Sequence, residues 1–141
     1  MVRLSLIVVD TGPLVAASLR DDPDHRVCVA WFEEVRDGLV VPDLVIPEVT
    51  YLLAAGARTS VEADFLRSLV SGHLVIEHVD DGDLLRAAEL VETYADLGLG
   101  TVDAAVVAIA ERLTATKIAT LDRRHFSVVR PAHVAGFELL P

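Results

Sequence analysis

Cysteine and aromatic residues are scarce in this 141-residue chain, and acidic residues outnumber basic ones. The single cysteine, Cys28, excludes a disulfide framework and a thiolate zinc cluster. Cys28 shares helical spacing with Trp31 and Phe32, a pattern typical of a helix face that packs into the core. We therefore interpret Cys28 as a small packing residue rather than a nucleophile.

Long hydrophobic runs are also missing. The first run, LSLIVV at 4–9, ends at Asp10 and is too short for a signal-peptide core or a membrane span. No later segment reaches spanning length without charges. We expect a soluble, cytoplasmic protein with no membrane contact. The composition, 52% hydrophobic and 24% charged, is globular, and the absence of repeats and linker-like stretches predicts a single domain over 1–141.

Basic charge is scarce overall but unevenly placed. The formal net charge of −10 ordinarily argues against a nucleic-acid partner. Residues 112–133, however, hold five basic residues and one acid, a net of +4, which leaves −14 for the rest of the chain. The basic residues are Arg112, Lys117, Arg123, Arg124 and Arg130. This segment is either a local strip that contacts phosphates or a solvated charge cluster.

Short apolar runs alternate with helical periodicities along the chain. The expected strands, of which the third could also be an extended connection, lie at 4–9, 39–41, 73–79, 117–122 and 137–141. The expected helices lie at 22–38, 43–56, 60–72, 81–100 and 101–116, and another begins near Pro13. Asp43 and Thr101 are candidate helix caps. The alternation predicts an α/β fold, a three-layer sandwich whose mainly parallel central sheet is flanked by helices.

Four acidic residues lie at strand ends or on apolar helices, positions where a packed fold rarely places a charge. Asp10 ends the first strand and Asp122 ends the strand at 117–122, so parallel strands would bring both to one rim of the sheet. Glu48 shares a helix face with Val45 and Leu52, and Asp103 lies in the first turn of an apolar helix. Each has a structural alternative: helix capping for Asp10 and Asp122, the helix dipole for Asp103, and exposure or pairing with an arginine for Glu48.

Crowded carboxylates are unfavourable unless they take up protons or hold a cation. Oxygen ligands without clustered histidine or cysteine indicate Mg²⁺ or Mn²⁺ rather than zinc. Such a cation activates water and stabilises charge on a phosphate. The residues alone thus favour metal-assisted phosphodiester cleavage.

The chain resembles the PIN-domain ribonucleases and, among them, the VapC toxins of bacterial toxin–antitoxin pairs. The resemblance rests on the motifs VVDTGPLVA, PEVTYLL, LGTVDAAVVAIAERL and IATLDRRHF. The order Asp, Glu, Asp, Asp, with intervals of 38, 55 and 19 residues, is more specific than any one motif. A PIN-like fold and a metal-dependent endoribonuclease acting on structured RNA (tRNA or rRNA) are what this resemblance implies.

The resemblance also implies roles for individual residues. Asp10 and Asp103 would be the most direct ligands of Mg²⁺ or Mn²⁺, with Glu48 and Asp122 acting partly through water, and these four acids would form the catalytic site. The supporting positions are Thr11 and Thr120 as hydroxyls that orient the carboxylates or the attacking water, Arg123, Arg124 and His125 as contacts to RNA phosphate, and Asp96 as an additional acid or a surface residue.

The resemblance further implies a VapB-like antitoxin, whose tail fills the acidic groove, and a homodimer. The pair Gly12–Pro13 departs from relatives that carry a second small polar residue there, so the role of residue 12 stays open.

Alternatives are a non-catalytic RNA- or protein-binding PIN-like module and a phospho-acceptor signalling domain, although the latter normally pairs its acids after the first strand. The DTG triplet at Asp10 also occurs in aspartic proteases, but those are rich in β-structure.

Overall fold

The computed structural model describes residues 5–55 and 58–141, and it has a five-stranded parallel sheet as its middle layer. The strands run in the order β3-β2-β1-β4-β5, and every neighbouring pair is parallel. Their bounds are β1 (Leu6–Val9), β2 (Gly38–Pro42), β3 (Leu74–Glu77), β4 (Lys117–Ala119) and β5 (Glu138–Leu140). This confirms the predicted parallel α/β sandwich; the predicted strand start at residue 4 and helix end at residue 56 lie outside the described residues.

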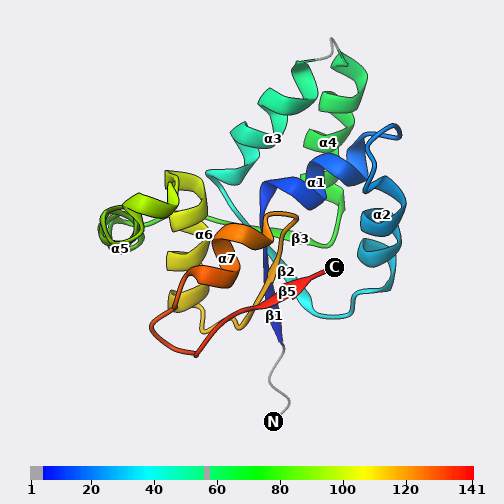
Figure 1. Cartoon of the computed structure of the whole chain (residues 1–141). Helices are drawn as coiled ribbons and strands as arrows, with labels where there is room; N and C mark the ends of the chain where they lie inside the picture. The colour runs from blue at the N-terminus through cyan, green and yellow to red at the C-terminus, as the bar shows by residue number, and fades with distance from the viewer. Residues whose placement is uncertain (1–4, 56–57) are drawn as a thin grey trace.

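Helices cover both faces of this sheet (Figure 1). They are α1 (Thr11–Ser18), α2 (His25–Glu34), α3 (Val45–Ala54), α4 (Thr59–Ser71), α5 (Asp81–Thr93), α6 (Thr101–Arg112) and α7 (Arg123–Val128), with a 3₁₀ turn η1 (Ala95–Leu97). In Figure 1, α5 and α6 lie on one side of the strands and α1 and α2 on the other, while α3 and α4 project together from the top. Within the described residues, no helix combines the length and the apolar character needed to cross a membrane.

The core is centred on β1 and α6. Ile7, Val8 and Val9 of β1 have no exposed surface, as expected for a central parallel strand covered on both faces. Residues 104–110 of α6 are all buried, because α6 packs against the sheet and is covered by α5. The prediction of a helix that is apolar on every side is therefore confirmed, and so is the burial of Cys28 in α2.

Several predicted element ends and caps are wrong. The helix predicted at 81–100 stops at Thr93, and after η1 the chain turns through Gly98, whose φ of 75° is the left-handed conformation that glycine adopts at little cost. Gly100, not Thr101, is the N-cap of α6. Leu44, not Asp43, is the N-cap of α3, since the Asp43 carboxylate instead accepts a hydrogen bond from the Val79 backbone at 3.2 Å.

The short helix α7 was not predicted. Asp122 is its N-cap and accepts a hydrogen bond from the backbone N–H of His125 at 3.3 Å, as its capping alternative anticipated. Phe126, 1% exposed, holds α7 on the core. The strand predicted at 117–122 therefore ends at Ala119, and the residues after it belong to the edge of the sheet where the candidate site lies.

Candidate active site

The candidate site lies beyond the carboxyl ends of the two central strands. Val9 of β1 pairs with Ala119 of β4, and the next backbone N–H, that of Asp10, donates to the Ala119 carbonyl at 2.9 Å. A cavity of about 650 Å³ opens there, and all four predicted acids line it. Its lining consists of Asp10, Thr11, Gly12, Glu48, Gly100, Thr101, Val102, Asp103, Leu121 and Asp122.

Asp10 is the most deeply buried of the four acids, with 5% of its surface exposed. Its Oδ2 accepts a hydrogen bond from the Thr120 hydroxyl at 2.9 Å, whereas Oδ1 has no partner among the described residues. The buried hydroxyl of Thr11 likewise has no partner there. Burial raises the pKa of Asp10 to about 6, and the nearby charges of Asp103 and Glu48 act in the same direction.

Asp103 enters the cavity from the first turn of α6. Burial raises its pKa, and the neighbouring carboxylates of Asp122 and Glu48 add to the rise, while His125 opposes it. Asp10 and Asp103 therefore form a pair of carboxylates whose ionised forms are disfavoured by burial and by their neighbours. A compensating positive charge in the cavity would favour the ionised forms of both residues.

Glu48 and Asp122 lie at more open positions. Glu48 is exposed in the first turn of α3, and Leu52 on the same face is 44% exposed. Of the predicted apolar face around Glu48, Val45 is buried and Leu52 is not, because α3 turns Val45, Val49 and Leu53 to the core; Glu48 itself is exposed, as its structural alternative anticipated. Asp122 is partly exposed, with one carboxylate oxygen engaged in capping α7.

His125 lies within the acidic group. Its ring Nδ1 is 2.7 Å from Oδ2 of Asp103 and 3.1 Å from Oδ2 of Asp122. The resemblance had placed this side chain against RNA phosphate. Sequence reasoning missed its contact with Asp103, although its position three residues after a capping Asp122 is a signal that it lies close to that carboxylate.

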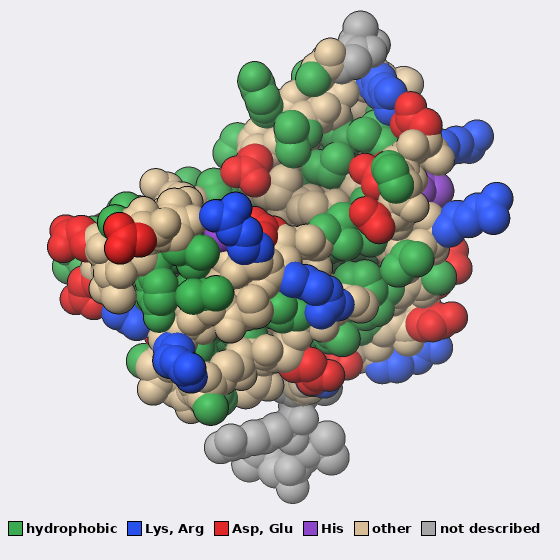
Figure 2. Space-filling model, viewed as in Figure 1, with side chains coloured by type: hydrophobic (Ala, Val, Ile, Leu, Met, Phe, Trp, Pro, Cys, Tyr) green, Lys and Arg blue, Asp and Glu red, His purple; other side chains and the backbone are tan. Residues whose placement is uncertain are grey.

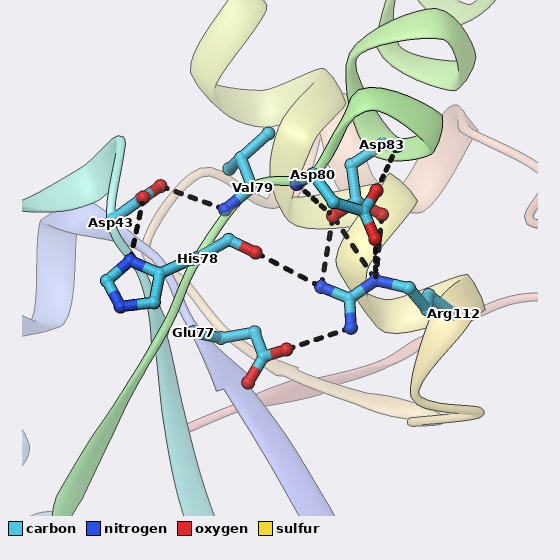
Figure 3. Close-up of polar contacts among 7 residues, drawn as sticks. All are labelled: Asp43, Glu77, His78, Val79, Asp80, Asp83 and Arg112. Carbon is cyan, nitrogen blue, oxygen red and sulfur yellow. Dashed lines mark hydrogen bonds and ion pairs between the residues drawn. The ribbon is translucent and has the colours of Figure 1, made fainter.

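The predicted basic strip is partly neutralised within the chain. Arg112 pairs with Glu77 at 2.8 Å and with Asp83 at 3.0 Å (Figure 3), and Lys117 pairs with Asp37 at 3.0 Å. Arg123 donates to the Pro141 carbonyl at 2.7 Å.

The two other arginines of the segment, Arg124 and Arg130, make no side-chain hydrogen bond or ion pair with the part of the chain that the structure describes. Figure 2 shows basic side chains over α7 next to acidic ones. The surface that could meet phosphate is thus smaller than the sequence suggests.

The structure also places two further residues, Asp96 and Gly12. Asp96 lies exposed in η1 and does not line the acidic cavity. Gly12 lies against Leu121: a Cβ at residue 12 would be 3.1 Å from the Leu121 Cβ. Residue 12 therefore leaves room for Leu121, an apolar side chain in the lining of an acidic cavity.

The donor set of the cavity fits a divalent cation. Four carboxylates surround it, a buried oxygen of Asp10 and the Thr11 hydroxyl lack partners among the described residues, and oxygen ligands of this kind suit Mg²⁺ or Mn²⁺. A larger hollow of about 1040 Å³ opens between α1, α2 and α4. Apolar side chains such as Leu14, Phe32 and Phe65 line much of it, so we place the site in the smaller cavity, which collects the strand-end acids.

The fold and cavity define a parallel α/β protein with an acidic site at the switch between its central strands. The profile of the PIN domain family matches residues 7–130, and the chain belongs to that family. The chain is 34% identical over 135 residues to the ribonuclease VapC26 of Mycobacterium tuberculosis, covering 96% of this chain and 100% of that protein.

Solved structures share the fold. VapC20 of Mycobacterium tuberculosis, a toxin that cleaves the sarcin–ricin loop, superposes with a TM-score of 0.79 at 17% identity and covers 91% of this chain and 98% of its own. VapBC2 from Rickettsia felis, bound to a DNA fragment from its promoter, gives a TM-score of 0.69 at 15% identity, with 96% and 99% covered. The predicted PIN-like fold is confirmed.

Proposed function

We propose that this protein is the toxin of a VapBC-type toxin–antitoxin pair, an endoribonuclease that hydrolyses phosphodiester bonds of structured RNA in the cytoplasm. One observation carries the proposal: Asp10, Glu48, Asp103 and Asp122, far apart in sequence, line one cavity at the carboxyl ends of parallel strands. The relationship to the ribonuclease VapC26 over nearly the whole chain supports the same reaction.

The four acids would hold Mg²⁺ or Mn²⁺, with Asp10 and Asp103 as the innermost ligands. When bound, the cation supplies stabilisation of negative charge on the phosphodiester and a lowered pKa for bound water. Thr120 would keep the Asp10 carboxylate oriented, and the Thr11 hydroxyl remains available to a water or a phosphate oxygen. Arg124 would attract the RNA backbone at the edge of the cavity.

The partners are proposed on the family relationship. A VapB-like antitoxin would inhibit the toxin by filling the acidic cavity, and two copies of the chain would form a homodimer. A toxin–antitoxin complex from Klebsiella pneumoniae is a structural neighbour, with a TM-score of 0.66 at 19% identity. The net charge of −10 suits a basic antitoxin segment as well as a cation.

Cleavage of a mixed tRNA and rRNA pool by the purified protein, free of antitoxin, tests the proposal. The reaction is run with Mg²⁺, with Mn²⁺ and with EDTA. We expect discrete fragments that require metal and that Asp103→Asn reduces on the order of 100-fold or more, since it removes a charge needed at the reacting centre.

Asp81→Asn is the matched control, because Asp81 is an exposed acid in the first turn of α5 and lies outside the cavity. Equal loss in both variants would contradict a specific role for Asp103. A folded wild-type protein that binds Mn²⁺ and RNA without cutting any RNA of the pool would favour the non-catalytic binding module instead.

A further inference from the structure

The two innermost carboxylates are each held by a side chain from one short segment, residues 120–125. The Thr120 hydroxyl donates to Oδ2 of Asp10 at 2.9 Å, and Nδ1 of His125 contacts Oδ2 of Asp103 at 2.7 Å. In both cases one carboxylate oxygen is engaged. The segment thus contacts two acids that come from different elements, the end of β1 and the start of α6.

The Thr120 contact has a defined direction. The backbone N–H of Asp122 donates to the Thr120 hydroxyl oxygen at 2.9 Å, so that oxygen is an acceptor there. The single hydroxyl proton is then directed to Asp10. This contact is buried, with Thr120 only 1% exposed.

The His125 contact is also directed. With Asp103 ionised, as a ligand of the proposed cation is, its carboxylate is only an acceptor, so Nδ1 carries the proton and donates it to Asp103. The ring is largely buried, with 17% of its side chain exposed, and Asp122 holds it from the other side. The backbone of His125 is fixed because its N–H donates to the capping Asp122 carboxylate.

This arrangement competes with a contact to RNA. Nδ1–H is committed to Asp103 and Asp122, and in a neutral imidazole protonated at Nδ1 the other ring nitrogen, Nε2, is an acceptor that offers no proton to a phosphate oxygen. Arg124, its exposed neighbour, has no such commitment among the described residues. Phosphate contact therefore suits Arg124 better than His125.

We infer that His125 is a positioning residue: it fixes Asp103 so that the other carboxylate oxygen is presented to the cation, and it is not a contact to RNA phosphate. The inference rests on the proposed function, because it assumes a cation between these acids. Partners that orient a metal ligand in this way typically contribute 10–100-fold to metal affinity.

The test is Mn²⁺ affinity without RNA, measured from the free-ion signal in electron paramagnetic resonance. His125→Leu and His125→Asn are a matched pair of similar size, of which only Asn keeps an N–H donor near the position of Nδ1. We expect His125→Leu to weaken Mn²⁺ binding about 10–100-fold, and His125→Asn to stay close to wild type. Arg67→Ala, at an exposed residue of α4 outside the cavity, should leave Mn²⁺ affinity unchanged.

Other results overturn the inference in distinct ways. Unchanged Mn²⁺ affinity with a raised KM for RNA in His125→Leu would make His125 an RNA contact. Tighter Mn²⁺ binding in His125→Leu would show that the imidazole competes with the cation. Wild-type protein that binds no Mn²⁺ would contradict the proposed function as well, whereas metal binding and RNA cleavage that are both insensitive to His125 would leave that function standing and remove only this inference.

Discussion

At the scale of single residues, Asp10 explains why a core strand ends in a charge. A carboxylate that is 5% exposed, near two others, is unfavourable in its ionised form, and its raised pKa reflects this. Asp10 occupies the N-cap position of α1, yet its side chain makes no capping hydrogen bond there. The position favours ligand binding over local stability.

This leads to a prediction for stability against pH in EDTA. The pKa of Asp10 rises from 3.8 to about 6 on folding, so the folded state binds more protons between these values. Stability is therefore highest below the unfolded pKa and falls as pH rises through 6. A rise of about two pKa units corresponds to about 2–3 kcal/mol. We therefore expect the free energy of unfolding of Asp10→Asn to be higher than that of wild type by this amount at pH 7.5, and by much less at pH 4.

Urea denaturation at the two pH values measures this difference, with exposed Asp81→Asn as the control. Adding Mn²⁺ should narrow the gap at pH 7.5, because only wild-type protein gains stability from a bound ligand of that site. A gap that is the same at both pH values would contradict a buried, titrating Asp10.

At the scale of elements, the neighbouring helices α5 and α6 are linked by an ionic network (Figure 3). Asp80 and Asp83 form a capping box at the start of α5, with hydrogen bonds of 2.8 and 3.0 Å. Arg112, at the end of α6, contacts Asp83 and Glu77. Asp83 is 3% exposed, so its charge depends on Arg112 for compensation.

We expect Arg112→Met to destabilise the protein by about 3 kcal/mol, because it leaves the buried Asp83 carboxylate without its cation. The matched control is Arg67→Met, which removes an exposed pair with Asp64 and should cost less than about 1 kcal/mol. Chemical denaturation of the two variants compares these costs. Equal losses would indicate that the Arg112 network is no more than a surface ion pair.

Sequence reasoning recovered what depends on local pattern and missed what depends on contacts between distant residues. Apolar runs and helical spacing located the five strands and most helices, and strand-end position brought Asp10 and Asp122 to one rim. Asp43, by contrast, bonds Val79, 36 residues away, and His125 bonds Asp103, 22 residues away. No periodicity encodes such pairs.

At the scale of the whole molecule, an acidic protein is proposed to bind an acidic polymer. Arg112 and Lys117 are used in ion pairs within the fold, so the net +4 of residues 112–133 overstates the charge that RNA would meet. Arg124 and Arg130 are exposed. RNA affinity should then depend on few phosphate contacts and on the cation.

We therefore expect a shallow salt dependence of RNA binding. Each phosphate contact to a single strand contributes about −0.7 to the slope of log K against log salt, so two arginines predict a slope near −1 to −2. Fluorescence anisotropy of a labelled single-stranded RNA with Asp103→Asn, which should bind without cleavage, measures the slope. Arg124→Ala and Arg130→Ala should each reduce the magnitude of this slope by about 0.7.

Arg67→Ala is the control. It removes the same charge from α4, where Arg67 pairs with Asp64, and should leave the slope unchanged. If Arg67→Ala reduces the slope as much as Arg124→Ala does, overall charge governs the encounter and α7 carries no phosphate site.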